Sequence, residues 1–203
     1  HRQGTLEELK GDYVIFATSA GGYNKEGSGE KKREFLRIAL RHNPVNVGSV
    51  TEGNVHTKSA EEILEAITDD SGAAAVFSDV DTLCAVIADL VKADLGISIT
   101  VSGLLDEVQA CCKQLGFSRH SVEHSLGIRG RTELLPRRKI MELHTMCGHG
   151  MVSFNFIQKM IEWVKLGRAT PAEAARCLAK PCECGVFNPV RAEKLLEEVR
   201  RLG

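Results

Sequence analysis

The chain has 203 residues, of which 43% are hydrophobic and 26% are charged, and its net charge is −1. These values are ordinary for a globular protein, and the length is sufficient for a sizeable hydrophobic core. They argue against a strongly basic, nucleic-acid-coating protein, and the longest apolar runs are too short to cross a bilayer. The first ten residues lack the basic and then apolar layout of a signal peptide.

The first 128 residues alternate between strand-like and helical runs. Apolar or β-branched runs between turn residues predict strands over residues 13–18, 45–50, 73–77 and 97–101, and a weaker strand over 121–128. Apolar residues at helical spacing predict helices over 30–41, 60–67, 81–93 and 104–115. This alternation is typical of an α/β domain, here residues 1–130, whose mixed or parallel sheet is layered with helices.

From residue 131 to residue 203 the pattern indicates helices alone. Helices are predicted over residues 132–143, 150–166, 172–179 and 190–202. Thr170-Pro171 and Asn188-Pro189 are start signals, because proline suits the first position of a helix. We therefore expect an all-helical C-terminal segment that carries the Cys/His clusters and packs on the first part.

The chain contains seven cysteines, an odd number: Cys84, Cys111, Cys112, Cys147, Cys177, Cys182 and Cys184. A chain of this size does not need disulfides, and neighbouring thiols such as Cys111 and Cys112 do not pair readily. We therefore expect reduced thiols and a cytoplasmic location.

Two short clusters in the last third of the chain carry most of the recognisable chemistry. They are the residues 144–150 (HTMCGHG) and 182–185 (CECG). Each precedes a predicted helix, whose free N–H groups favour thiolates, and each contains glycine, which lets amides turn towards sulfur. The pattern predicts a metal site made by Cys147, His149, Cys182 and Cys184. The plainer alternative is that these cysteines are small buried hydrophobic residues.

Two metals fit these ligands. Mixed Cys and His ligation favours a zinc ion. An iron–sulfur cluster is the alternative, held by Cys147, Cys182 and Cys184, with Cys177 as a candidate fourth ligand. His144 stands three residues before Cys147 and is a ligand, a partner of a ligand or a helix cap.

Several basic and imidazole side chains near the clusters suit an anionic substrate. From residue 129 to the C-terminus, 14 basic residues face 8 acidic ones, which would attract an anion. Arg129, Arg131 and Arg137 are candidates for gripping a carboxylate or phosphate. His149 and His124 are the candidate catalytic residues, His149 as fourth ligand or proton shuttle and His124 as general base. A solvated surface is the plainer alternative for the basic residues.

The glycine-rich stretch over residues 19–29 follows a predicted strand and precedes a helix, where phosphate-binding loops occur. It lacks both the P-loop and the dinucleotide-binding patterns. If it bound an anion, Lys25, Lys31 and Lys32 would supply the charge. The alternative is a surface loop.

These patterns together predict a cytoplasmic metalloprotein. We favour a metal-dependent enzyme that acts on a small anionic molecule, and keep as the alternative a structural metal in a non-catalytic interaction or regulatory module. Neither membrane nor nucleic acid is an expected partner, and self-association is left open.

Overall fold

The structure is a computed structural model that describes residues 2–202, with the side chain of residue 202 left out. Its strands are β1 (Tyr13–Thr18), β2 (Asn46–Ser49), β3 (Gly53–Asn54), β4 (Ala73–Phe77) and β5 (Ser98–Ser102). Its α-helices are α1 (Leu6–Leu9), α2 (Ser28–Leu40), α3 (Ala60–Ala66), α4 (Val80–Ala93), α5 (Leu105–Gln114), α6 (Arg138–His144), α7 (Phe154–Lys165), α8 (Pro171–Ala179) and α9 (Pro189–Leu202). A short 3-10 turn covers Thr132–Leu134.

The sheet has the strand order β3-β2-β4-β1-β5, and each pairing among the described strands is antiparallel. The expectation of a parallel or mixed sheet is therefore wrong. The reason is that the strands of two β-α-β connections, β1-α2-β2 and β4-α4-β5, alternate in the sheet. β1 and β2 run in the same direction on either side of β4, while β4 and β5 run in the same direction on either side of β1. Helices α2 and α4 thus join parallel strands, as the alternating pattern implied, but every immediate neighbour is antiparallel, as in split β-α-β folds.

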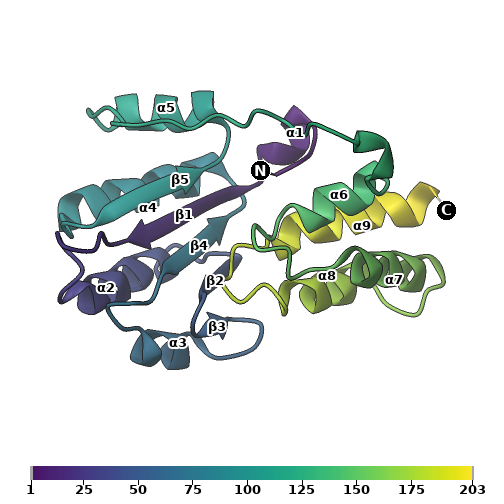
Figure 1. Ribbon diagram of the computed structural model, residues 1–203, viewed down its shortest axis with the longest axis horizontal. Coiled ribbons are helices and arrows are strands. Elements are labelled where there is room, and N and C mark those ends of the chain that lie inside the picture. Colours follow the sequence, from purple (N-terminus) through teal and green to yellow (C-terminus); the bar gives the residue numbers. More distant parts are fainter. Residues whose placement is uncertain (1, 203) are drawn as a thin grey trace.

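Both faces of the sheet are packed, because successive strand residues point to opposite sides. Tyr13, Ile15 and Ala17 of β1 belong to a core with α2, α4 and α5. Val14 of β1 belongs to a second core, which also contains Ala74 and Val76 of β4 and the apolar sides of α6–α9. In Figure 1 these four helices form one group beside the sheet, away from α2 and α4. The C-terminal segment therefore shares a core with the strands. The division into two domains stays a prediction.

Three local expectations differ from the structure. Residues 121–128 form no strand; Val122, Leu126 and Ile128 alternate with polar residues or glycine, but their side chains stay exposed, so neither face of the segment is buried. The predicted helix over 132–143 is split at Pro136, into the 3-10 turn and α6. Helix α7 begins at Phe154 rather than at residue 150, since the Ser153 side chain accepts the amide of Phe156 as an N-cap.

A disulfide joins Cys84 of α4 to Cys111 of α5, with their Cα atoms 5.6 Å apart. The expectation that all thiols are reduced is therefore wrong. Helices α4 and α5 pack together, which places the two cysteines at a separation usual for disulfides. The neighbouring Cys112 is free and buried. Cytoplasmic location stays a prediction.

Helix α1 is tied to the C-terminal helices through Glu8. The carboxylate of Glu8 lies 3.0 Å from the Lys139 ammonium on α6 and accepts the amide of Thr5. Lys139 also lies 2.7 Å from Glu198 on α9. Burial alone would raise the pKa of Glu8, but the Thr5 amide and Lys139 outweigh it and lower this pKa to about 2.

The lowered pKa of Glu8 predicts a contribution to acid stability. Since the folded value lies below that of the unfolded chain, the contribution is complete above about pH 5 and is lost as the pH falls towards 2. We expect Glu8→Gln to lower the free energy of unfolding at pH 7 by about 1–2 kcal/mol, after allowing for solvent screening. The difference from wild type should vanish near pH 2 in urea titrations. Glu7→Gln, at an exposed neighbour, is the control and should match wild type; a Glu8→Gln curve parallel to wild type at all pH values would contradict the prediction.

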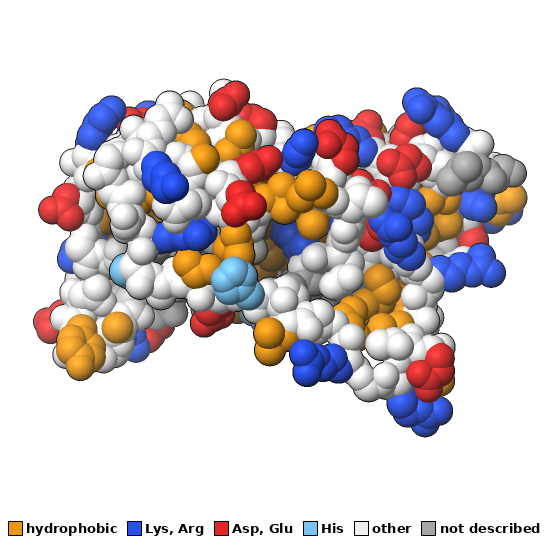
Figure 2. Space-filling view, turned by 90° about the horizontal axis from the view of Figure 1, so that it is seen from above, with side chains coloured by type: hydrophobic (Ala, Val, Ile, Leu, Met, Phe, Trp, Pro, Cys, Tyr) orange, Lys and Arg blue, Asp and Glu red, His pale blue; other side chains and the backbone are white. Residues whose placement is uncertain are grey.

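Within the described part of the chain, no helix combines the length and the apolar character that a membrane crossing requires. On the face shown in Figure 2, Lys and Arg side chains stand among Asp and Glu side chains over much of the surface. A mixed surface of this kind is usual for a globular protein.

Candidate functional site

The first cysteine loop, residues 145–153, connects α6 to α7 and carries Cys147 and His149. Its ends are drawn together by His144, whose Nδ1 lies 2.8 Å from the Val152 carbonyl oxygen and whose ring packs on Phe154. These contacts give His144 a role other than the three considered from the sequence: it holds the ends of the loop together. Gly150 has φ +70°, a conformation that glycine adopts readily, and the turn it makes brings backbone amides towards Cys147.

The second cysteine loop, residues 180–188, connects α8 to α9 and is docked on β2 and β3 by two buried asparagines. The Asn54 side chain donates to the Cys182 carbonyl at 2.9 Å and also reaches the carbonyls at the end of α8. The Asn46 side chain donates to the Phe187 carbonyl at 2.8 Å. These bonds satisfy backbone oxygens that would otherwise be buried without partners, and they set the position of the loop on the sheet.

The same loop approaches β2 so closely that neither backbone leaves room for a side chain. A Cβ atom on Gly48 would lie 2.7 Å from the Gly185 nitrogen, and a Cβ atom on Gly185 would collide with the backbone of Val47 and Gly48. Gly185 also has φ +71°. Glycine at both positions lets the second cysteine loop lie directly on the sheet.

The two loops bring three thiols together. Cys182 is 0% exposed, and its sulfur lies 3.8 Å from that of Cys184. Cys147 lies close enough to Cys182 to shift its pKa, so Cys182 is the central member. Cys147 and Cys184 are only 3% and 5% exposed. We call these three residues the thiol cluster; Cys177 lies on α8 at the edge of the same core.

The surroundings favour negative charge on the two outer thiols. The neighbouring Cys182 thiol, with help from backbone amides of the first cysteine loop, lowers the pKa of Cys147 although burial opposes it. Cys182, the Val186 amide and His149 lower the pKa of Cys184 in the same way. The pKa of Cys182 is raised, since its proton is shared with both neighbours. Low-pKa thiols bind metals and react readily.

His149 lies at the outer side of the cluster. It is exposed at the surface, and its imidazole is near enough to Cys184 to lower the pKa of that thiol. All four predicted metal ligands are thus close together, three of them buried and one reaching the solvent.

The cluster fits a single ion in part. Two thiolates bound to one tetrahedral zinc at about 2.3 Å have sulfurs about 3.8 Å apart, which is the separation of Cys182 and Cys184. However, among residues 2–202 no group of three or more His, Cys, Asp or Glu side chains is arranged so that it could hold a metal ion. Binding would therefore require rotation of side chains such as that of exposed His149.

A buried charged group that sequence reasoning missed lies beside the thiol cluster. Asp12, whose side chain is 0% exposed, pairs with Arg2 at 3.0 Å and with Arg191 at 2.8 Å. The Arg2 guanidinium is also near enough to Cys182 and Cys184 to interact with their charge. These residues come from the two ends of the chain, and no local pattern marks them as partners.

The other predicted site residues lie elsewhere. His124, Arg129, Arg131 and Arg137 are exposed in the connection between α5 and α6. Arg131 pairs with Glu133 at 3.1 Å. Within residues 2–202, no hydrogen bond or ion pair joins any of the four to the cysteine loops. Their roles in catalysis and substrate binding stay predictions.

The glycine-rich stretch before α2 holds a carboxylate of the protein itself. The amides of Gly27 and Gly29 donate to the Asp69 side chain at 2.9 and 2.6 Å. Lys32 donates to the backbone carbonyl of the same residue at 2.8 Å. Asp69 thus occupies the position where an external anion would bind, which favours the alternative of a surface loop.

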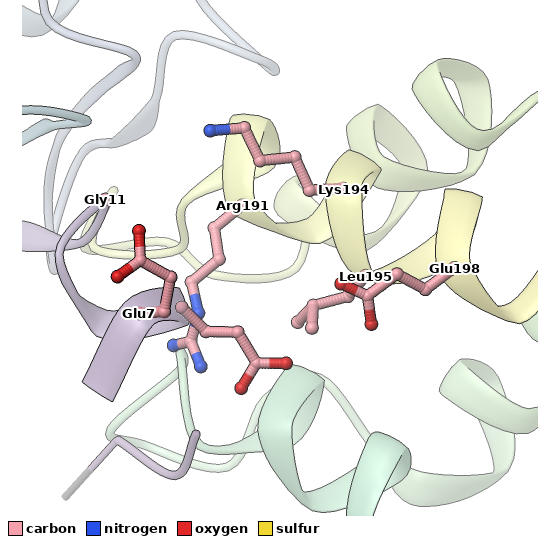
Figure 3. A pocket seen from close by; sticks show the side chains of 7 residues that line it. Glu7, Gly11, Arg191, Lys194, Leu195 and Glu198 are labelled. Atoms are coloured by element: carbon pink, nitrogen blue, oxygen red, sulfur yellow. The ribbon is translucent and has the colours of Figure 1, made fainter. Parts of the chain in front are cut away.

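Two cavities lie away from the thiol cluster. The smaller, of about 240 Å³, is lined by α1 and α9, and Figure 3 shows Arg191 extending from α9 towards α1 beside it. The larger, of about 560 Å³, is lined by the N-terminal segment, the 3-10 turn and α6. Neither is lined by a residue of the thiol cluster.

Comparison of the chain with known protein families, with curated proteins and with solved structures gives no match. The thiol cluster and His149 are therefore the basis for the function proposed below.

Proposed function

We propose that this is a metal-binding protein in which Cys147, Cys182, Cys184 and His149 hold one zinc ion. The observation that carries the proposal is the meeting of the three thiols, contributed by loops more than 30 residues apart in the sequence. The sulfur separation of Cys182 and Cys184 suits one ion. In a four-iron cluster each cysteine binds a different iron, so a cluster would need the sulfurs farther apart.

The geometry best supports a structural role for this ion. The first cysteine loop joins α6 to α7, and the second is docked on β2 and β3 by Asn46 and Asn54. An ion shared by the two loops would link the C-terminal helices to the sheet. Buried sulfurs and four protein ligands are typical of structural zinc sites. This corresponds to the non-catalytic interaction or regulatory module considered from the sequence.

A metal-dependent enzyme that acts on a small anionic molecule is the second candidate. The observation that favours it is the exposure of His149, the one ligand that water or a substrate could replace without opening the core. The buried guanidinium of Arg2 beside the thiols would favour an anion at that position.

Both candidates predict bound zinc, and the zinc affinity of a His149 variant separates them. We expect protein purified without oxygen to be colourless and to contain one equivalent of zinc by elemental analysis. Under the structural role, His149→Ala should bind zinc at least about tenfold more weakly in competition with a chromogenic chelator, since a ligand is lost. His124→Ala, in the exposed connection, is the matched control and should bind as wild type does.

The other outcomes are equally specific. Undiminished zinc affinity in His149→Ala would support the enzyme, because the imidazole would then not be a required ligand. Brown protein with broad absorption near about 400 nm would show an iron–sulfur cluster instead. Wild-type protein that binds neither zinc nor iron would overturn the proposed function.

A further inference from the structure

The Arg2 side chain lies beside the thiol cluster and hydrogen-bonds both cysteine loops. One terminal nitrogen of its guanidinium donates to the carbonyl of Met146, at 2.7 Å, and the other donates to the carbonyl of Val186. Met146 directly precedes Cys147, and Val186 follows Cys184 by two residues. A planar guanidinium with both ends engaged sets the separation of the two groups that it bridges.

Arg2 is itself held in place. Its Nε pairs with Asp12 at 3.0 Å, so each side of the guanidinium has a partner. Asp12 also accepts from Asn188 at 3.1 Å and pairs with Arg191, whose side chain is 3% exposed. Arg191 in turn donates to the carbonyl of Gln3, next to Arg2. The N-terminal segment is thereby fastened between the first cysteine loop and α9.

The positive charge of Arg2 suits a thiolate site. Arg2 shares the carboxylate of Asp12 with Arg191, and Arg191 also lines a cavity with Glu7 and Glu8. The Arg2 side chain lies within interaction distance of Cys182 and Cys184. Three thiolates around a divalent ion carry a net charge of −1, and arginine stays protonated in proteins, so Arg2 would offset this buried negative charge.

We propose that Arg2 is the positioning residue of the metal centre: it holds the two cysteine loops at the separation that one ion requires, and its positive charge offsets that of the thiolates. The inference rests on the proposed function and adds to it the residue that sets the spacing of the metal ligands.

The test compares Arg2→Met and Arg2→Lys with a matched control. Arg33 also joins two backbone carbonyls, those of Leu64 and Ile67, but lies on α2 away from the thiols. Arg33→Met therefore removes a similar bridge without touching the cluster. For each variant we would measure the zinc dissociation constant with a competing chelator, the absorption spectrum of the cobalt-substituted protein, and the thermal midpoint.

Arg2→Met should weaken zinc binding by about 10- to 100-fold, as expected for residues that orient metal ligands, and should alter the thiolate-to-cobalt absorption. Arg2→Lys keeps the charge but cannot bridge both carbonyls, so its affinity should lie between those of Arg2→Met and wild type. Arg33→Met should lower the thermal midpoint and leave zinc affinity and the cobalt spectrum unchanged. Folded Arg2 variants with wild-type affinity and spectrum would overturn the inference, as would an equal loss of affinity in Arg33→Met. If Arg2→Met does not fold, Arg2→Lys decides by the same criteria.

Binding of phenylarsine oxide, which bridges neighbouring thiols, separates this inference from the proposed function. If wild type binds no zinc but binds the arsenical tenfold more tightly than the Arg2 variants, the metal proposal fails and the positioning of the thiols by Arg2 stands. If wild type binds no zinc and all variants bind the arsenical equally, both fail.

Discussion

If the proposed zinc site is correct, the Cys182→Ser variant should bind almost no zinc. Cys182 is the central thiol, in contact with both Cys147 and Cys184, and no solvent reaches it. Serine keeps the size but replaces the soft thiolate with a hydroxyl, which is a poor ligand for zinc. We expect zinc affinity to fall by at least about 100-fold, measured by chelator competition and by elemental analysis after dialysis.

The loss of metal should also destabilise the fold, because an ion that binds only the folded state stabilises it. With free zinc about 1,000-fold above the dissociation constant, binding would raise the free energy of unfolding of the wild type by about 4 kcal/mol. Cys182→Ser should lack this stabilisation. The free energy of unfolding of the variant should therefore no longer depend on zinc concentration. This can be followed by urea unfolding with and without zinc.

Cys177→Ser is the matched control for this experiment. Cys177 is half-buried on α8 at the edge of the same core, and its replacement should leave zinc content and zinc-dependent stability unchanged. Zinc retained by Cys182→Ser at wild-type affinity would remove this residue from the site. Zinc lost from Cys177→Ser would instead indicate that the fourth ligand is a cysteine.

Gly185→Ala should be the most disruptive single substitution of a glycine in the cysteine loops. The new methyl group would collide with the backbone of Val47 and Gly48, and neither strand β2 nor the loop can move without breaking the bonds made by Asn46 and Asn54. The positive φ of Gly185 adds a conformational penalty of about 1–2 kcal/mol. With overpacking of about 1–3 kcal/mol, we expect a loss of about 2–5 kcal/mol in the free energy of unfolding.

Gly167→Ala isolates the part of this effect that comes from backbone conformation alone. Gly167 ends α7 with φ +66°, and among the described residues no atom lies within 4 Å of a Cβ built on it. Its replacement should lower stability by about 1–2 kcal/mol, the same conformational penalty as at Gly185. Equal losses in the two variants, compared by urea unfolding, would show that the close approach to Gly48 is unimportant. Gly185→Ala should also weaken zinc binding, whereas Gly167→Ala should not.

Helices and strands were predictable where their signals are local. The apolar run over residues 13–18 and the alternation near residue 98 both became strands, and Thr170-Pro171 begins α8 as expected. Such signals arise from steric and hydrogen-bonding preferences within one or two turns of chain. The same reasoning failed over residues 121–128, where it rested on a weak pattern.

Strand order and pairing were not predictable in this way. The helix between β1 and β2 does connect parallel strands, but whether another strand enters between them depends on a segment nearly 30 residues further along the chain. The disulfide between Cys84 and Cys111 has the same origin, since it depends on how α4 packs against α5. Strand pairing and this disulfide depend on contacts between segments far apart in the chain, which a short stretch of sequence does not determine.

For the candidate site, the amino-acid sequence was enough to single out Cys147, His149, Cys182 and Cys184, because thiols and imidazole beside glycine form a local chemical pattern. It was not enough to find Arg2, Asp12 and Arg191, whose types are common and whose positions are unremarkable until the ends of the chain meet. Nor did it reveal that Asp69 occupies the glycine-rich loop. Ligand identity is a property of single residues, whereas ligand spacing, charge balance and burial arise from contacts between distant segments, and these exist only once the chain has folded.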